Sequence, residues 1–152
     1  MLDFAQMVTH LAVALALGAF MGLEREMIGK EAGVRTSMLV AGGAAIFAMI
    51  GLNLPYLVAT SPENLPEVIA RNSGFLAVIA NIVVGIGFLG AGVIIKTDEH
   101  VKGLTTAATM WATAAVGTLA GLGLIAFAAT SALIITSLLY ILTRTKLMRY
   151  KK

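Results

Sequence analysis

The charged residues of this 152-residue chain are confined to a few short segments, and this segregation constrains the fold more than any other feature. No Asp, Glu, Lys or Arg occurs in 4–23, 36–62, 72–95 or 103–143, which are 20, 27, 24 and 41 residues long. Charged residues make up 12% of the chain, whereas soluble domains carry about 25%. Because about 18 apolar residues suffice for a transmembrane helix, each stretch is long enough to cross a bilayer. The sequence therefore predicts a polytopic membrane protein.

The longest charge-free stretch predicts two crossings rather than one. As a single helix its 41 residues would be about 62 Å long, against a hydrocarbon core of about 30 Å. Gly121-Leu122-Gly123 lies near its middle, and glycine permits tight turns, so we place a hairpin there. The prediction is an all-α bundle of five transmembrane helices. Their expected bounds are 4–23, 36–54, 75–95, 104–120 and 124–142.

The distribution of Lys and Arg predicts the orientation of the bundle. With five crossings, ten of the eleven basic residues fall on one side and only Arg71 on the other, whereas four crossings leave almost no bias. Because basic loops stay in the cytoplasm, the amino terminus is expected outside and the carboxyl terminus inside, with the 55–71 loop external. The expected organisation is a transmembrane domain at 1–143 followed by a basic cytoplasmic tail at 144–152.

The same features exclude several classes of function. The polar segments are too short to hold a soluble catalytic domain, which needs about 100 residues, so we predict neither an enzyme nor catalytic residues. The absence of cysteine excludes disulfides and thiolate metal sites, and no cofactor is predicted. The basic tail directly follows a hydrophobic stretch, which favours the lipid bilayer as its partner over nucleic acid.

Small and hydroxyl-bearing residues recur every fourth position in two of the expected helices. These positions are Thr105, Thr109, Thr113, Gly117 and Gly121 in one helix, and Gln6, His10, Ala14, Gly18 and Gly22 in the other. Such ridges let helices approach closely in a bilayer. We interpret them as packing surfaces, with a transport path as the alternative.

Four glycines, Gly85, Gly87, Gly90 and Gly92, lie within eight residues of the third expected helix. Their spacing includes a GxGxxG pattern, but a dinucleotide site needs a preceding strand and a soluble βαβ unit, so we reject that reading. Two interpretations stay open. The glycines allow close approach of neighbouring helices, or they break the helix so that freed carbonyl groups line a cavity.

Two polar side chains within the expected spans are candidates for function. The amide of Asn81 is costly against lipid, so we expect it to point inward, either to another helix or to a passing ion. The indole of Trp111 is expected to bond to a neighbouring helix or to face water. No Asp or Glu lies within a predicted span, which counts against a magnesium site at mid-membrane. Carbonyl groups and waters are the ligands left for such a site, so bound magnesium stays an alternative.

The charged loops are interpreted as solvated faces. For the alternative of a cation path, Glu24, Glu26, Asp98 and Glu99 would form its cytoplasmic entrance.

Three stretches together resemble the membrane domain of the MgtC/SapB family. They are G-A-F-M-G-L-E-R-E and A-G-V-R-T within 18–36, G-I-G-F-L-G-A-G-V-I-I at 85–95, and G-L-T-T-A-A-T-M-W at 103–111. The residues that carry over are Glu24, Arg25, Arg35, Gly87, Gly90, Gly92, Thr105, Thr106 and Trp111. The resemblance implies a five-span protein of the bacterial inner membrane, linked to adaptation to scarce magnesium. Many members continue into a soluble cytoplasmic domain, which is not expected here.

Two functional hypotheses follow. The first is a non-enzymatic membrane protein of magnesium homeostasis or stress adaptation, which acts by helix–helix interaction with itself, as a homodimer, or with other membrane proteins. The second is a transporter of magnesium or another cation, with a path along the third and fourth helices. The candidate residues for function or packing are Glu24, Arg25, Glu26, Arg35, Asn81, Gly87, Gly90, Gly92, Thr105, Thr106, Thr109, Trp111 and Thr113.

Overall fold

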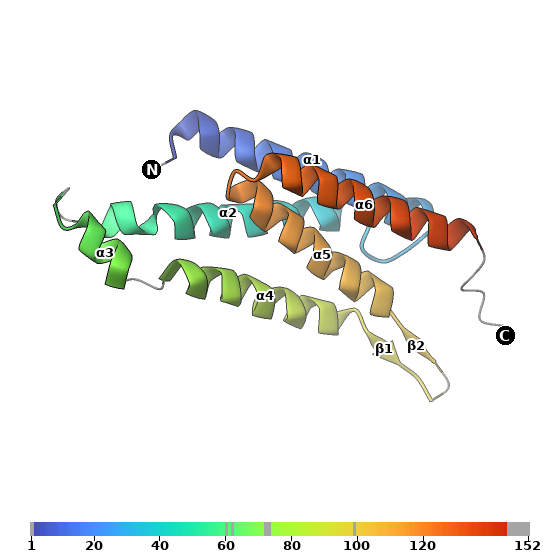
Figure 1. Cartoon of the computed structure of the whole chain (residues 1–152). Helices are drawn as coiled ribbons and strands as arrows, with labels where there is room; N and C mark the ends of the chain where they lie inside the picture. Colours follow the sequence, from blue (N-terminus) through green and yellow to red (C-terminus); the bar gives the residue numbers. More distant parts are fainter. Residues whose placement is uncertain (1, 60, 62, 72–73, 99, 146–152) are drawn as a thin grey trace.

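The computed structural model describes residues 2–59, 61, 63–71, 74–98 and 100–145, and these are largely helical. Long helices run back and forth side by side, so that α1 begins at one end of the bundle and α6 ends at the other (Figure 1). The elements are α1 (Phe4–Met27), α2 (Val34–Val58), α3 (Leu65–Arg71), α4 (Gly74–Gly92), β1 (Ile95–Lys96), β2 (Val101–Lys102), α5 (Leu104–Gly121) and α6 (Ile125–Arg144).

Three of these helices, α1, α2 and α6, are long and apolar enough to cross a membrane. The apolar part of α4, Ala77–Gly92, is shorter, and α5 has 18 residues, or about 27 Å. The crossing of the membrane by α4 and α5, and with it the count of five spans and the orientation of the termini, stays a prediction.

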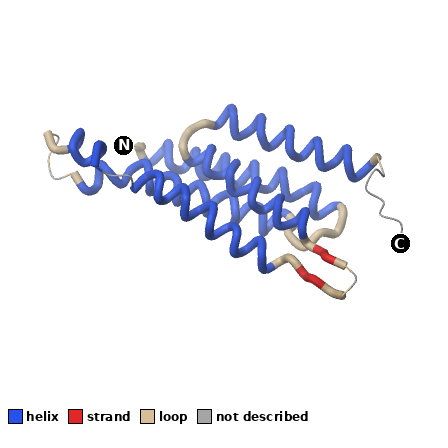
Figure 2. Tube along the Cα trace, turned by 60° about the horizontal axis from the view of Figure 1, so that its bottom comes forward, coloured by secondary structure: helices blue, strands red, loops and turns tan. Residues whose placement is uncertain are grey.

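The helix boundaries differ from the expected ones mainly where polar or proline residues were taken as loop. Helix α1 extends to Met27, so Glu24 and Arg25 lie within its last turns and are buried. Helix α2 continues through Pro55, beyond which the Ala59 N–H donates to the Pro55 carbonyl. The loop that was predicted to be external contains α3, and the loop after α4 forms an antiparallel pair of short strands, which the all-α prediction lacked. Figure 2 shows these strands projecting beyond the helices.

The predicted hairpin within the longest charge-free stretch is confirmed. Helix α5 ends at Gly121, and Gly123 adopts a φ of 82°, a left-handed conformation that favours glycine. Helix α6 then begins at Ile125 and runs back along the bundle (Figure 1).

Helices α1, α2 and α5 pack directly against one another through their small residues. A Cβ atom added at Gly18 of α1 would lie 2.6 Å from the Ser37 carbonyl oxygen. One added at Gly22 would lie 2.7 Å from the Val34 Cα. On α5, a Cβ at Gly117 would collide with the backbone of Ala41. The glycines of both predicted ridges therefore lie at close helix contacts, whereas Gln6 and Thr105 of the same ridges are exposed.

Candidate functional site

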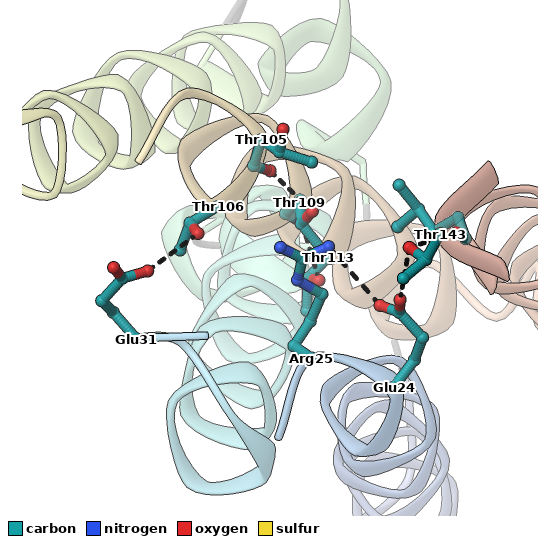
Figure 3. A network of polar contacts seen from close by, with 9 residues as sticks. Glu24, Arg25, Glu31, Thr105, Thr106, Thr109, Thr113 and Thr143 are labelled. Carbon is teal, nitrogen blue, oxygen red and sulfur yellow. Dashed lines mark hydrogen bonds and ion pairs between the residues drawn. The ribbon is translucent and has the colours of Figure 1, made fainter. Parts of the chain in front are cut away.

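A cluster of polar side chains lies at the end of the bundle where α1 ends and α5 begins (Figure 3). We call it the Arg25 cluster. Its members are Glu24, Arg25, Glu31, Thr105, Thr106, Thr109, Thr113 and Thr143. They come from α1 and the 28–33 loop that follows it, from α5 and from α6, so the cluster joins three parts of the chain that are distant in the sequence.

Arg25 is the most deeply buried charged side chain of the cluster, with 2% of its surface exposed. Its Nη1 lies 3.5 Å from Oε2 of Glu24, which is longer than a good hydrogen bond. Its Nε atom is buried and has no hydrogen-bond partner. The other carboxylate oxygen of Glu24 lies 3.5 Å from the Thr143 hydroxyl of α6. The guanidinium is thus held among packed helices with its hydrogen-bonding capacity incompletely used.

The threonines of α5 use their hydroxyl groups in two ways. Thr106 donates to Oε2 of Glu31 at 3.2 Å and so fastens the 28–33 loop to α5. Thr109 and Thr113 donate to the carbonyl oxygens four residues earlier in α5, at 2.7 and 2.8 Å. These two hydroxyls are therefore satisfied by their own helix and need no ligand.

Glu31 lies outside the expected spans, and its pKa is held below the ordinary value. Hydrogen bonding from its own backbone N–H is the main cause, and the Thr106 hydroxyl adds to it. Both donors stabilise the charged carboxylate. Glu31 is therefore an anion at neutral pH, bound to the start of α5.

A lateral groove is the second feature. It has a volume of about 760 Å³ and lies between α2 and α4, with α5 contributing to its wall. We call it the α2–α4 groove and define it by Arg35, Gly43 and Phe47 of α2, Asn81 and Gly85 of α4, and Met110 of α5. Most of its lining is apolar, and its polar side chains are those of Arg35, Thr36 and Asn81.

The structure contradicts one interpretation of the glycine-rich helix and limits the other to one glycine. Helix α4 is continuous from Gly74 to Gly92, so the broken-helix interpretation is wrong. Close approach occurs only at Gly90, where an added Cβ would lie 3.4 Å from the Ala107 Cβ. No atom lies within 4 Å of a Cβ added at Gly85, Gly87 or Gly92.

Asn81 lies elsewhere than expected, whereas the expectation that the Trp111 indole bonds to a neighbouring helix or faces water stays a prediction. Asn81 is exposed at the edge of the groove instead of pointing into the chain. Trp111 is 51% exposed and lies one turn after Ala107, the residue that contacts α4. Both side chains are therefore on the surface of a single chain.

The residues predicted for a cation entrance do not form one group. Glu24 is buried in the Arg25 cluster, whereas Glu26 accepts a hydrogen bond from the Val34 N–H at 2.8 Å. Asp98 is exposed in the turn between the strands, and Glu99 lies outside the described residues, as does the tail from 146 onward. Within the described residues, no three His, Asp or Glu side chains are close enough to share a metal ion.

Sequence reasoning missed Glu31, Thr143 and Gly43. Glu31 and Thr143 pair with residues 75 and 119 positions away in the sequence. No local pattern announces such contacts. Gly43 lines the α2–α4 groove. The sequence gave no sign of this, because the groove exists only where α4 lies beside α2.

Comparison with known proteins places this arrangement in a family. Residues 11–148 match the MgtC family. Protein MgtC of Salmonella typhimurium is 42% identical over 76% of the chain and 43% of its own length. Protein MgtC of Brucella abortus is 43% identical over 82% of the chain and 46% of its own length. An uncharacterized protein of Synechocystis is 42% identical over 81% of the chain and 46% of its own length.

The chain spans less than half the length of these relatives. No solved structure matches it. The match covers the helices that build both the Arg25 cluster and the groove. On this basis the chain belongs to the MgtC family.

Proposed function

We propose that this chain is a non-enzymatic, multi-pass protein of the bacterial inner membrane that acts in magnesium homeostasis or low-magnesium adaptation. It acts by helix–helix interaction with a second copy of itself or with another membrane protein. The magnesium link comes from the family. The mode of action rests on one observation, the unpartnered outer face of α4.

The outer face of α4 consists of Ala80, Val84, Gly87, Phe88 and Ala91, all of them exposed. Ala80, Val84, Gly87 and Ala91 follow the 4-3-4 spacing that places residues on one side of a helix. Helices in a bilayer associate through such small residues because lipid offers no hydrophobic driving force between them. A partner helix could therefore approach α4 closely at Gly87.

Two polar or amphipathic side chains border this face. Asn81 precedes Val84 by three residues and Phe88 by seven, so its amide lies on the same side of α4. An amide exposed to hydrocarbon is costly, and a partner that hydrogen-bonds to it removes that cost. Trp111 follows Ala107 by one turn on the side of α5 that contacts α4, and tryptophan is frequent among the residues that dominate interfaces.

Single-cysteine cross-linking tests this proposal, because the chain contains no cysteine of its own. Val84→Cys places a thiol on the outer face of α4, and Leu133→Cys places one near the middle of α6, where Leu133 is 57% exposed. In membranes of the producing cells, a short thiol cross-linker should join Val84→Cys to a second copy or to another membrane protein. Leu133→Cys should give little product. Equal yields at the two positions, or none at Val84, would contradict the proposal.

The alternative, cation transport along α4 and α5, is not favoured by a specific contact. The hydroxyls of Thr109 and Thr113 are engaged by their own helix. Reconstitution distinguishes the two functions. Magnesium flux into proteoliposomes that contain only this chain, lost in Asn81→Leu, would replace our proposal by transport. Flux equal to that of empty vesicles would remove transport.

A further inference from the structure

The α2–α4 groove has the dimensions of a lipid chain from one leaflet. Arg35 and Phe47 are twelve residues apart on α2, which corresponds to about 18 Å along the helix axis. Half of a hydrocarbon core of about 30 Å is about 15 Å. Leu39 and Phe47 on its wall are 74% and 57% exposed, so the groove opens sideways toward the surroundings of the bundle.

Two glycines make the groove hollow. Gly43 on α2 and Gly85 on α4 both line it, and a Cβ atom at either position would meet no atom within 4 Å. In contrast to the glycines of α1 and α5, they bring no helices into contact. They leave space that neither wall fills, and the volume of about 760 Å³ lies in the range of small-molecule sites.

A positive charge stands at one end of this apolar space. Arg35 lies in the first turn of α2, is exposed, and forms no ion pair with any carboxylate in the described part of the chain. The nearby Glu26 already accepts a hydrogen bond from the Val34 N–H. Thr36, next to Arg35, also lines the groove and adds a hydroxyl at the same end.

We propose that the α2–α4 groove binds one anionic phospholipid of the cytoplasmic leaflet. The phosphate lies at Arg35, and an acyl chain lies between α2 and α4 past Gly43 and Gly85. The expected orientation places Arg35 on the cytoplasmic side, where anionic lipids attract basic residues near the membrane surface. The groove adjoins the outer face of α4 at Asn81, but its other defining residues are not part of that face, and the proposal does not depend on a protein partner.

Charge favours a lipid over a second copy of this chain as the occupant. Ten of the eleven basic residues share the expected side of Arg35, against five of the eight acidic ones. A second copy in the same orientation would therefore bring a surplus of like charge to the mouth of the groove. An anionic headgroup brings the opposite charge together with the apolar chain that the groove lacks.

Native mass spectrometry of the detergent-purified full chain tests this inference. The protein is mixed with equal amounts of phosphatidylglycerol and phosphatidylcholine that carry the same acyl chains. We expect the protein to retain phosphatidylglycerol preferentially, and Arg35→Gln to reduce that preference about fivefold, as expected for the loss of one basic residue at an anionic surface. Arg144→Gln, which removes an exposed arginine at the same end of the bundle, should leave the preference unchanged.

A second pair of variants tests the acyl part of the site. Gly43→Leu and Gly85→Leu each fill the open space from one wall, and should lower retention of both lipids with little change in the thermal unfolding midpoint. Because the two glycines are on different helices, a folding defect in one variant leaves the other as the test.

Four outcomes would overturn the inference. The first is an unchanged preference in Arg35→Gln, and the second is undiminished lipid retention in a folded groove-filling variant. The third is complete release of the lipid by inorganic phosphate, which would make Arg35 a site for free phosphate. The fourth is a shift from dimer to monomer in a groove-filling variant without a change in bound lipid. This result would show that the groove is an interface between copies of the chain.

Discussion

Two sets of glycines in this chain do opposite things. A Cβ atom added at Gly18, Gly22 or Gly117 would lie within 3 Å of the backbone of α2 or of the residue just before it, whereas one added at Gly85 or Gly87 on α4 would touch nothing. The first set brings α1, α2 and α5 together. The second leaves an open helix surface and an open groove. The residue type alone therefore does not reveal whether a glycine serves the interior of the chain or something outside it.

The largest effect is expected within the packed region, at Arg25. Arg25→Met removes a guanidinium that is 2% exposed and leaves the buried Glu24 carboxylate without its cation. Breaking a buried ion pair from one side costs about 3–5 kcal/mol. Denaturant unfolding in mild detergent measures the loss.

Two further variants sharpen this experiment. Replacing both members, Glu24→Gln with Arg25→Met, should recover most of the stability, because no charge is then left unpaired. Arg144→Met, at an exposed arginine, should be close to wild type. If the Arg25→Met single variant were as stable as the wild type, the Glu24–Arg25 ion pair would not be desolvated in the folded protein.

The next largest effect is expected when one methyl group is added in the packed region, and it is compared with the same change on the open face of α4. Gly117→Ala places its Cβ against the Ala41 backbone, so a helix must shift, at a cost of about 1–3 kcal/mol. Gly87→Ala enters open space and should be neutral or stabilising by up to about 1 kcal/mol, since alanine favours helix. Opposite signs in the two thermal unfolding midpoints confirm the contrast. Equal losses would show that the face of α4 is filled within a single chain.

Gly90 should give an intermediate effect, because among the four described glycines from 85 to 92 it is the one in contact with α5. An alanine fits, since its Cβ would lie 3.4 Å from the Ala107 Cβ, but Gly90→Leu has no room at this distance and should push α4 from α5. We expect a lower thermal unfolding midpoint for Gly90→Leu. The midpoint of Gly90→Ala should be close to that of the wild type. Unchanged stability of Gly90→Leu would indicate that this side of α4 can turn toward lipid.

The smallest effect concerns the loop held by Glu31. The folded pKa of Glu31 lies below its ordinary value of 4.5, so its contribution to stability is present above that pH and is lost as the pH falls through the lowered pKa. The unfolding midpoint of the wild type should decrease on acidification below about pH 4.5 by slightly more than that of Glu31→Gln. Identical pH profiles for the two proteins would mean that Glu31 does not couple to folding.

Much of the helix arrangement follows from the sequence, because hydrocarbon excludes charge and each charge-free stretch marks a helix. The turn near Gly121 was predictable for a similar reason, since one helix cannot use 41 apolar residues in a single crossing. The packing role of Gly18 and Gly117 also followed from their fourfold spacing. These predictions depend on local composition alone.

The site was less predictable, because it depends on which helices become neighbours. Glu24 and Arg25 were placed in a solvated loop, yet they are buried once α1 continues and α5 and α6 pack beside it. The contact between Thr106 and Glu31 joins residues 75 positions apart. The spacing of Gly85 and Gly87 is compatible both with close helix packing and with an open surface. Only the positions of α2 and α5 in the folded chain leave the space beside these two glycines unfilled.

The short strands after α4 limit how the groove can change shape. The β1–β2 pair joins α4 to α5 directly, and Gly103, with a φ of 86°, fixes the chain closely against Val93 where α5 begins. The strands hold the end of α4 next to the start of α5, whereas the start of α4 follows α3 in the chain. If α4 moved away from α2 while the strands kept it next to α5, the groove would widen more near Asn81 than near Arg35.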